Sequence, residues 1–393
     1  MTFSNSDIVK FRAETKGVNN VLHFNNAGAS LPPDIVHNTV VHHLEREREI
    51  GGYEAKAEAA MRFDQFYVEV AKLINAKPSE IAFIENATRA WDMAFYSLPL
   101  DAGDEIITIE AEYASNYLAY LQAAKHKGVV IKVAPNDASG QVDVVALGQL
   151  ITKNTKLISI THVPSQGGLI NPAAEVGKIA KAHGILYLLD ACQSVGQIEI
   201  DVGEICCDML SATGRKFLRG PRGTGFLYIK EELANSLEPV FIDLHAAEWL
   251  DGNKYELAKG AIRFENWECF YAGKLGLMEA AKYANNIGMK HIVARNQFLA
   301  NQLRQSLTKM KGVHLTDLGI NKSAIVTFYK DGIAAENAHA KLRAQNINVS
   351  VSPSSYARLD LGKRGLHSLI RASIHYYNTE EEVENFVRAI HVL

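Results

Sequence analysis

The sequence predicts an α/β protein with a large three-layer α/β/α domain, whose sheet is mostly parallel, and a smaller α+β domain. Between residues 75 and 230, short apolar runs alternate with amphipathic segments, and after residue 275 the helical patterns become longer. The chain has 393 residues, of which 47% are apolar and 22% are charged. A globular chain of this size and composition can form two cores.

Six short apolar runs are predicted to be strands, at residues 81–84, 105–109, 129–133, 157–160, 185–189 and 225–229. Such runs are typical of strands that are buried on both faces of a parallel sheet. Helical segments lie between them, as at residues 173–183, where apolar residues recur at helical spacing before Gly184. Alternating strands and helices predict the α/β domain.

The C-terminal part has helical patterns at residues 280–308 and 334–344 and short apolar runs at residues 324–328 and 369–374. This mixture predicts the smaller α+β domain. No repeat or linker marks the junction. We therefore predict a large domain over residues 20–270 and a small domain made of residues 1–19 and 271–393.

Charge and hydropathy favour small-molecule chemistry. The 41 basic and 44 acidic residues give a net charge of -3, without the basic block that nucleic acid requires. No apolar run reaches the roughly 18 residues of a membrane span, and the N-terminus has no signal-peptide core. We expect a cytoplasmic protein without nucleic-acid or membrane partners.

The four cysteines indicate neither a disulfide framework nor a zinc site. Cys206 and Cys207 are adjacent, while Cys192 and Cys269 stand alone, and no C-x-x-C spacing occurs. We expect reduced thiols and no metal site.

A lysine in a glycine-rich turn is the first candidate catalytic residue. Lys216 follows Thr213, Gly214 and Arg215, and the turn continues to the apolar run that begins at Gly225. Neighbouring cations lower the pKa of a lysine and make its amine a nucleophile suited to a Schiff base, while glycines let main-chain N–H groups approach a phosphate. Taken alone, the segment could also be a solvated basic turn.

Asp190 ends the apolar run 185–189, where a strand of an α/β sheet faces the ligand crevice. A carboxylate there can pair with a protonated pyridine nitrogen and keep the ring an electron sink. The alternative role for Asp190 is a helix N-cap.

Two further segments suit anionic groups. Ala87 and Thr88 follow the run 81–84 and begin a helix, whose first N–H groups can bind a phosphate. Local sequence equally allows Asn86 or Thr88 to be a simple N-cap. Arg371 lies in the predicted strand 369–374, where a guanidinium can bind a carboxylate through two hydrogen bonds, or form a structural salt bridge.

Together these segments resemble the class V aminotransferase family of fold-type I pyridoxal 5′-phosphate (PLP) enzymes, which includes cysteine desulfurases, isopenicillin N epimerase-like proteins and C–S lyases. The resemblance extends from Asn25 to Glu381. It implies the fold of a fold-type I PLP-dependent transferase. It also implies that PLP is bound as a Schiff base on Lys216.

The resemblance implies a role for each matching position. Asp190 and Gln193 match a D-x-x-Q element that contacts the ring nitrogen and the phenolic oxygen, and Tyr113 falls on the ring-stacking position. The implied cofactor-binding residues are Ala87, Thr88, Tyr113, Ser165, Asp190, Gln193, Thr213, Arg215 and Lys216, with Lys216, Asp190 and Tyr113 as the catalytic set. Arg371, with Ala27 and Gly28, is the implied substrate site.

The Arg263-Phe264-Glu265 segment resembles the stretch that reaches the partner subunit's cofactor in this family. A homodimer with active sites at the subunit interface is therefore implied.

Three departures separate the chain from the desulfurases. Residues 346–370 contain no cysteine, whereas desulfurases carry a persulfide-forming cysteine before the carboxylate arginine. Ser165 replaces an asparagine, and Arg215 replaces a histidine. The amino-acid sequence of residues 214–225 and 348–358 is most similar to that of the hercynylcysteine sulfoxide lyases and of epimerase-like relatives.

The function predicted is β-elimination of sulfur from a cysteine-derived amino acid, with Lys216 removing the Cα proton. Transamination of a small amino acid is the first alternative, because the fate of the carbanion decides the reaction. A PLP-fold binding protein without activity is the second. A nicotinamide-dependent enzyme is disfavoured, since no G-x-G-x-x-G follows the first predicted strand.

Overall fold

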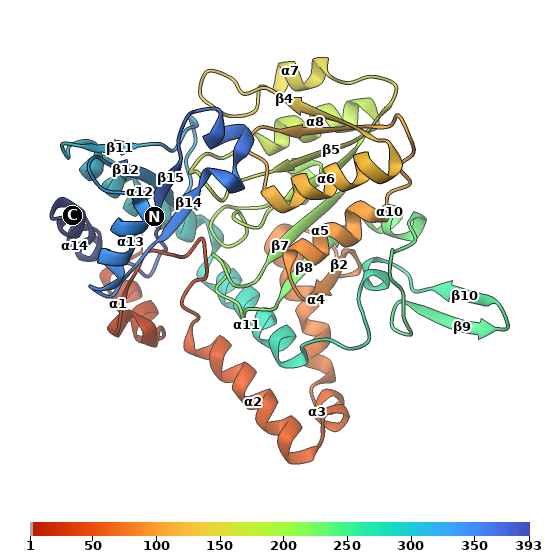
Figure 1. Cartoon of the computed structure of the whole chain (residues 1–393). Coiled ribbons are helices and arrows are strands. Elements are labelled where there is room, and N and C mark those ends of the chain that lie inside the picture. The colour runs from red at the N-terminus through yellow and green to blue at the C-terminus, as the bar shows by residue number, and fades with distance from the viewer. Residues whose placement is uncertain (1–2) are drawn as a thin grey trace.

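A seven-stranded sheet forms the middle layer of the larger part of this computed structural model, which describes residues 3–393 (Figure 1). Its strands are β2 (Ile81–Ile84), β3 (Glu105–Ile109), β4 (Val130–Ala134), β5 (Thr155–Thr161), β6 (Leu186–Asp190), β7 (Met209–Thr213) and β8 (Gly225–Ile229). They lie in the order β2-β8-β7-β6-β5-β3-β4, and only β8 runs antiparallel to its neighbours. The predicted α/β class with a mostly parallel sheet is confirmed.

Apolar side chains point to both faces of this sheet. Adjacent residues such as Ile106 and Ile107 of β3, or Leu157 and Ile158 of β5, belong to cores on opposite faces. One face is covered by α5 (Ala87–Tyr96) and α6 (Ala114–Lys127), and the other by α4 (Ala60–Ile74), α8 (Ala173–His183) and α11 (Tyr271–Ile287). This burial of alternate residues explains the continuous apolar runs in the sequence.

The six predicted strands are all present, but sequence reasoning missed β7. Its residues include Ser211, Ala212 and Thr213, which are small or polar and do not form an apolar run. The central position between β6 and β8 buries all five residues of β7. Tertiary context therefore decides a strand that local sequence does not indicate.

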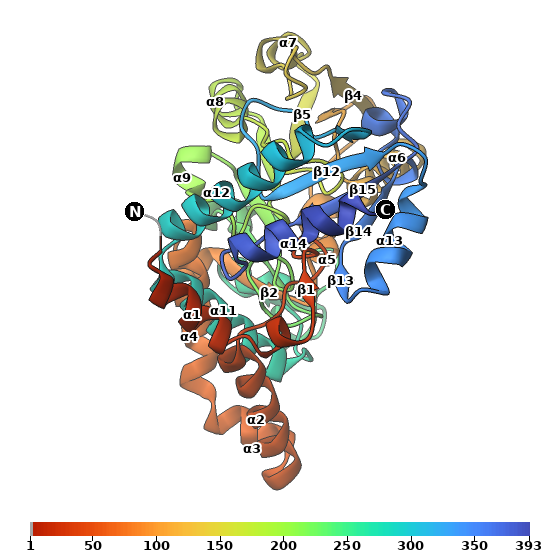
Figure 2. The same ribbon diagram turned by 90° about the vertical axis from the view of Figure 1, so that its left-hand side faces the viewer.

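The smaller part contains a four-stranded antiparallel sheet in the order β11-β12-β15-β14. Its strands are β11 (Val313–Leu315), β12 (Ile325–Lys330), β14 (Ser350–Pro353) and β15 (Ser368–Ser373), and its helices are α12 (Met289–Thr308), α13 (Ala335–Arg343) and α14 (Glu380–His391). Figure 2 shows α12 and α14 side by side across this sheet.

The predicted helical pattern over residues 280–308 is present, but it is divided between two helices, α11 and α12. Gly288 ends α11 and precedes α12 with φ +90°, a conformation that glycine adopts without steric cost. The break lets α11 pack on the large sheet while α12 covers the small one.

The chain crosses between the two parts more than once. β1 (Leu22–His23) pairs with β13 (Ile347–Asn348), and Phe24 lies in the core of the small sheet. Conversely, Leu277 of α11 lies in a core of the large sheet. The domain boundaries at residues 20 and 270 remain a prediction. The segment of β1 and Phe24, after residue 20, packs on the small sheet, and α11, after residue 270, packs on the large one.

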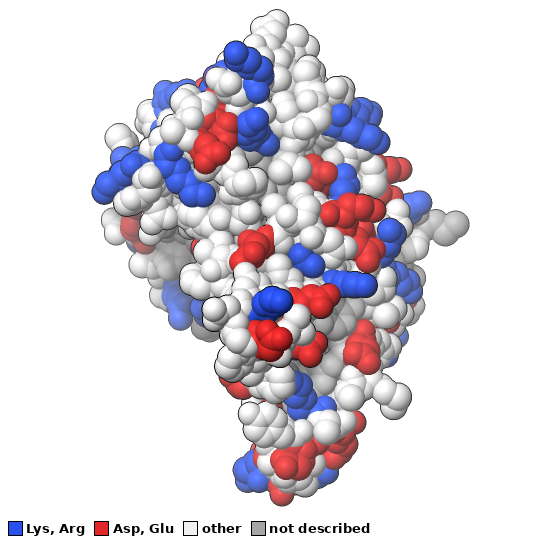
Figure 3. All heavy atoms as spheres, turned by 90° about the vertical axis from the view of Figure 1, so that its right-hand side faces the viewer, with Lys and Arg blue, Asp and Glu red and all other residues white. Residues whose placement is uncertain are grey.

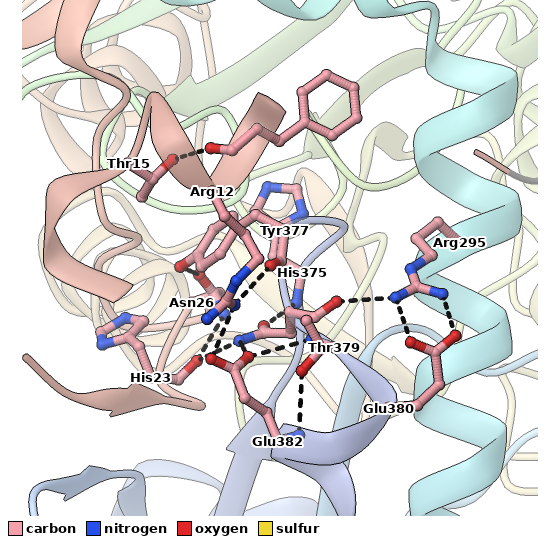
Figure 4. Close-up of polar contacts among 12 residues, drawn as sticks. Arg12, Thr15, His23, Asn26, Arg295, His375, Tyr377, Thr379, Glu380 and Glu382 are labelled. Carbon is pink, nitrogen blue, oxygen red and sulfur yellow. Dashed lines mark hydrogen bonds and ion pairs between the residues drawn. The ribbon is translucent and has the colours of Figure 1, made fainter. Parts of the chain in front are cut away.

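Polar contacts join the N-terminal segment to the C-terminal helix (Figure 4). The Arg12 guanidinium pairs with Glu382 at 2.8 Å and donates to the Tyr377 carbonyl oxygen at 3.1 Å. The Tyr377 hydroxyl donates to Asn26 Oδ1 at 2.6 Å. These contacts fix the segment that leads into Ala27.

The remaining elements are α1 (Asn5–Ala13), η1 (Lys16–Asn19), α2 (Asp34–Ile50), α3 (Gly52–Glu58), η2 (Pro78–Glu80), α7 (Val144–Gln149), α9 (Val202–Ile205), α10 (Glu231–Ser236), β9 (Ala247–Asp251), β10 (Lys254–Leu257), η3 (Ala261–Phe264), η4 (Ser354–Tyr356) and η5 (Arg358–Gly362). The β9–β10 hairpin projects from the body of the protein (Figure 1).

Among residues 3–393, no helix is both long and apolar enough to cross a membrane. On the face seen in Figure 3, acidic and basic side chains are interspersed.

Candidate active site

The carboxyl ends of three neighbouring strands form the base of the site. Thr161 and Asp190 lie opposite each other at the ends of β5 and β6, and Ser211 of β7 lies opposite Asp190 on its other side. β7 ends at Thr213. Parallel strands present their carboxyl ends at one edge of the sheet, which is where α/β proteins bind ligands.

Lys216 lies in the turn that joins β7 to the antiparallel β8. Main-chain hydrogen bonds hold this turn, from Gly214 N–H to Thr224 O (2.9 Å), Gly220 N–H to Gly214 O (2.7 Å) and Arg219 N–H to Lys216 O (2.9 Å). A Cβ atom on Gly214 would lie 2.3 Å from Thr224 Oγ1, so no larger residue fits there. The glycine sets the path of the chain that brings Lys216 to the strand ends.

The Lys216 side chain is buried, with 7% exposure. Burial is the main cause that lowers the pKa of Lys216, and Arg215 and Arg371 lower it further, while Cys192 and Asp190 act in the opposite direction. Sequence reasoning assigned this shift to neighbouring cations. The structure puts desolvation first, because the charged ammonium loses water in the closed site.

Asp190 is held as a hydrogen-bond acceptor without a cationic partner. Its Oδ1 accepts from the Cys192 main-chain N–H at 2.9 Å, and its Oδ2 accepts from Asn116 Nδ2 at 3.0 Å. Asp190 is 3% exposed and forms no ion pair with another of the residues 3–393. A buried carboxylate in this state suits a ligand that presents a positively charged N–H group.

The start of α5 lies beside these strand ends. Asn86 is its N-cap, with Oδ1 accepting from Arg89 N–H at 3.0 Å, so the N-cap reading of Asn86 is correct. Ala87 and Thr88 form the first turn, whose N–H groups have no partner within the helix. A Cβ atom on Gly225 would lie 3.1 Å from Ala87 N, so this glycine lets β8 approach the helix start.

Gln193 is hydrogen-bonded to two other predicted site residues. Its Nε2 donates to the Ala27 carbonyl and to Ser165 Oγ, both at 3.0 Å, while its buried Oε1 has no partner among the described residues. Tyr113 immediately precedes α6, and its main-chain N–H donates to the Glu112 carboxylate at 2.8 Å. Because Gln193 lines the inner cavity, its unused Oε1 can accept a hydrogen bond from a ligand there.

Arg371 reaches the site from β15 of the small sheet. Its Nη1 donates to the Ser165 carbonyl at 2.7 Å and its Nη2 to Asn25 Oδ1 at 3.5 Å, and its buried Nε has no partner among the described residues. Burial, followed by the nearby charge of Arg215, lowers the pKa of Arg371 to about 10. A structural salt bridge, the alternative considered for Arg371, does not form within residues 3–393.

Two adjoining cavities bring the predicted residues together. The inner one, of about 190 Å³, is lined by all nine predicted cofactor residues: Ala87, Thr88, Tyr113, Ser165, Asp190, Gln193, Thr213, Arg215 and Lys216. The outer one, of about 850 Å³, is lined by the three predicted substrate residues, Ala27, Gly28 and Arg371. Lys216 borders both cavities, so one side chain can act on ligands in either.

Sequence reasoning did not select four residues that also line the inner cavity, Asn86, Thr161, Val163 and Cys192. The position of Thr161 directly after the predicted strand 157–160 was a usable signal, because Asp190 was found in the same way. Cys192 lies between Asp190 and Gln193, and burial raises the pKa of its thiol.

The side chains of Arg263, Phe264 and Glu265 are all buried inside this chain. Arg263 donates to the Ala258 and Leu237 carbonyl oxygens, and Glu265 accepts from Phe83 N–H at 2.7 Å. The exposed large apolar side chains of this region follow the segment and are Trp267 and Phe270.

Comparison with known proteins agrees with this geometry. The family model "Aminotransferase class-V" matches residues 21–386. The chain belongs to the class-V aminotransferase family. A probable cysteine desulfurase of Pyrococcus abyssi is 30% identical over 380 residues, which cover 95% of this chain and 94% of that protein.

Solved structures share the fold over nearly the whole chain. A cysteine desulfurase from Thermococcus onnurineus NA1 has a TM-score of 0.91 and 28% identity, covering 100% of this chain and 99% of that one. The cystine C–S lyase C-DES, solved with its product cysteine persulfide, has a TM-score of 0.87 at 21% identity, covering 96% and 99%. A C-DES mutant, solved with glycine covalently linked to PLP, has a TM-score of 0.88 at 21% identity, covering 97% and 98%.

Class-V aminotransferase enzymes depend on PLP, and this chain is an enzyme of that family. Three features of the site fit the cofactor. Asp190 offers an unpaired carboxylate for a protonated ring nitrogen, the first turn of α5 beside Gly225 offers N–H groups for a phosphate, and Lys216 offers a buried amine for the aldehyde.

Proposed function

We propose that the protein is a PLP-dependent C–S lyase that releases sulfur from a cysteine-derived amino acid by β-elimination. The observation that carries this proposal is that Lys216 borders both an inner cavity containing Asp190 and an outer cavity containing Arg371. A base, an electron-withdrawing ring and a carboxylate site are the three requirements for removing a Cα proton.

PLP, when bound through a Schiff base to Lys216, supplies a ring that accepts electrons from Cα. The Asp190 carboxylate would pair with the protonated ring nitrogen. Thr88, Thr213 and the first N–H groups of α5 would hold the phosphate, and Tyr113 would cover the ring. Ser165 and Gln193 would supply polar groups at the phenolic oxygen.

Lys216 supplies the base when its amine is free. Its lowered pKa keeps a larger fraction of the amine neutral near neutral pH, so that it can accept the Cα proton. The Cβ–S bond then breaks, and the sulfur leaves with the bonding electron pair. The proton taken from Cα is returned to the departing sulfur. Addition of water to the remaining three-carbon fragment gives pyruvate and ammonia, so the overall reaction consumes one water and releases a thiol.

Arg371 binds the substrate α-carboxylate. Its guanidinium is buried and unpaired, and the hydrogen bond to Ser165 orients it. Ala27 and Gly28 line the same cavity, and the Arg215 guanidinium donates to the Gly28 carbonyl. Arg371 and Arg215 place positive charge in part of the outer cavity, which Glu110 and Glu112 also line, so the carboxylate of an amino acid is favoured beside the two arginines.

The cysteines of the chain favour elimination over sulfur transfer to the enzyme. No cysteine lines the outer cavity, and residues 346–370 contain none. Cys192 lines the inner cavity, where burial keeps its thiol protonated. The sulfur is therefore expected to leave as a free thiol, sulfide or persulfide.

We also propose a cytoplasmic homodimer whose active sites lie at the subunit interface, near Arg263, Phe264 and Glu265. Exposed apolar side chains next to this segment, Trp267 and Phe270, support an interface there. The β9–β10 hairpin adds the exposed Trp249 and Leu250. Apolar surface of this kind is typical of subunit contacts.

The test is a product analysis with a panel of amino acids, cystine and cysteine S-conjugates. Pyruvate, ammonia and a sulfur product in equal amounts are expected. A keto acid that retains the substrate side chain, with the cofactor recovered as its amine, would instead show the transaminase. Absence of any PLP absorbance band after PLP addition would favour a protein that does not use the cofactor.

A further inference from the structure

A second buried carboxylate, that of Glu112, lies behind Asp190. It is 7% exposed and accepts five hydrogen bonds. The donors are Thr108 Oγ1 at 2.8 Å, Tyr113 N–H at 2.8 Å, Asn116 Nδ2 at 3.0 Å, Tyr120 hydroxyl at 3.3 Å and Thr161 Oγ1. No Lys, Arg or His side chain of residues 3–393 forms an ion pair with it.

The amide group of Asn116 bridges the two carboxylates. Asn116 Nδ2 donates at 3.0 Å both to Glu112 Oε1 and to Asp190 Oδ2. An NH₂ group has two hydrogens, so both are used. If Glu112 did not accept one of them, the amide could rotate and present its oxygen to the Asp190 carboxylate, which would repel it.

Glu112 also fixes the position of Tyr113. The Tyr113 main-chain N–H donates to Glu112 Oε1 at 2.8 Å and to Thr161 Oγ1 at 3.1 Å. One carboxylate therefore constrains both Asp190, which faces the ring nitrogen in the proposed function, and the residue expected to cover the ring.

We propose that Glu112 is a positioning residue, which orients Asp190 through the Asn116 amide and adds negative charge behind it, and thereby strengthens cofactor binding. This inference rests on the proposed function, since it assumes that PLP occupies the inner cavity. The charge of Glu112 favours a protonated ring nitrogen, because like the charge of Asp190 it stabilises a nearby cation.

The protonation state of Glu112 gives this proposal a signature that a purely structural residue would lack. Burial, together with the charge of Asp190, raises the pKa of Glu112 to about 7, against the effect of its hydroxyl donors. The other titratable groups that face it are Tyr120 of α6 and Tyr187 of β6, which stay protonated because burial raises the pKa of both. Its negative charge is thus present above neutral pH and lost below it.

The experiment compares PLP dissociation constants of the wild type and Glu112→Gln across pH, by titrating cofactor-free protein. Because the substitution removes a charge close to Asp190, we expect a dissociation constant raised about tenfold at about pH 8.5 and less than about twofold at about pH 6. A ratio near one at both pH values would overturn the inference.

Asn116→Leu provides a second test that does not depend on the folding of Glu112→Gln. Loss of the bridging amide should raise the PLP dissociation constant by about tenfold. Because the charge of Glu112 also acts directly on the site, the double variant at about pH 8.5 should bind more weakly than Asn116→Leu, but by a factor clearly smaller than the about tenfold effect of Glu112→Gln alone. Independent, additive effects would contradict action through Asn116. An unchanged PLP dissociation constant in Asn116→Leu would also contradict action through Asn116.

Glu105→Gln is the matched control. Glu105 begins β3, pairs with Lys132 and lies at the opposite end of the strand from the site. This variant should keep PLP affinity within about twofold of the wild type, because the same charge is removed far from Asp190. If the wild type itself binds no PLP, the proposed function fails, whereas wild-type binding with an unaffected Glu112→Gln refutes only this inference.

Discussion

The Arg371 guanidinium donates a 2.7 Å hydrogen bond to the main-chain carbonyl of Ser165, which joins strand β15 of the small sheet to the loop after β5 of the large one. The proposed carboxylate site thus depends on the packing of the two sheets against each other. Arg371 and Lys216 meet at one cavity only because both parts of the chain are in place.

Arg371→Lys should weaken substrate binding without displacing the cofactor. A lysine presents a point charge and cannot form two parallel hydrogen bonds with a carboxylate, so we expect KM to rise about 10- to 100-fold. Steady-state kinetics with the best substrate of the panel measures this. The PLP absorbance of the variant is the control, and its loss would argue against a role limited to the substrate.

Lys216→Ala should abolish turnover, because it removes both the amine that holds the cofactor and the proposed base. We expect the rate to fall by at least about a thousandfold and the visible absorbance of the covalently bound cofactor to disappear. Pyruvate production and an absorbance spectrum measure the two effects. Turnover that survived the substitution would refute the assignment of Lys216.

Arg219→Met should destabilise the protein. The guanidinium is 2% exposed, donates to the Leu31 carbonyl (2.9 Å), the Tyr376 hydroxyl (2.5 Å) and Thr15 Oγ1 (2.6 Å), and lies 4.4 Å from the centre of the Tyr377 ring. Because the substitution leaves buried oxygens without donors, the free energy of unfolding should fall by about 2 kcal/mol.

Urea denaturation measures this change. The exposed Arg48, whose side chain is 75% accessible, is the control, since Arg48→Met should change stability by less than about 0.5 kcal/mol. Equal effects of the two substitutions would show that the buried hydrogen bonds of Arg219 contribute nothing measurable.

His23 should make the protein sensitive to acid. Burial lowers the pKa of His23 to about 4, and its ring contacts the Ala29 carbonyl and the Asn348 amide. Above about pH 6.5 the histidine is neutral in both the folded and the unfolded protein. Between about pH 6.5 and 4 only the unfolded chain takes up a proton, so the free energy of unfolding falls as the pH decreases towards 4.

For a single histidine with this shift, the free energy of unfolding is expected to fall by about 2 kcal/mol between about pH 6.5 and 5. Urea denaturation of the wild type and of His23→Gln at both pH values measures this loss. The contribution of His23 is the difference between the two proteins in how much the free energy of unfolding changes with pH. Identical slopes would show that folding does not change the pKa of His23.

The sequence alone was sufficient for the α/β class and for six of the seven large-sheet strands, and together with the family resemblance it indicated nine of the residues that line the inner cavity. Most strands buried on both faces form apolar runs, and a residue at the carboxyl end of such a strand, such as Asp190, lies at the ligand edge of a parallel sheet. The Gly214-Arg215-Lys216 turn was recognisable because its lysine stands among glycines and cations between two apolar runs and matches a family element. These features depend on residues that are near one another in the sequence.

Contacts between distant segments were decided only by the tertiary structure. Local propensity did not indicate β7 or the break at Gly288, and no sequence pattern showed that Asn116 bridges Glu112 to Asp190, 74 residues away. Burial, not neighbouring charge, was found to be the main cause of the lowered Lys216 pKa. Desolvation and hydrogen bonding between remote segments depend on the complete packing of the chain, so they cannot be read from a local run of residues.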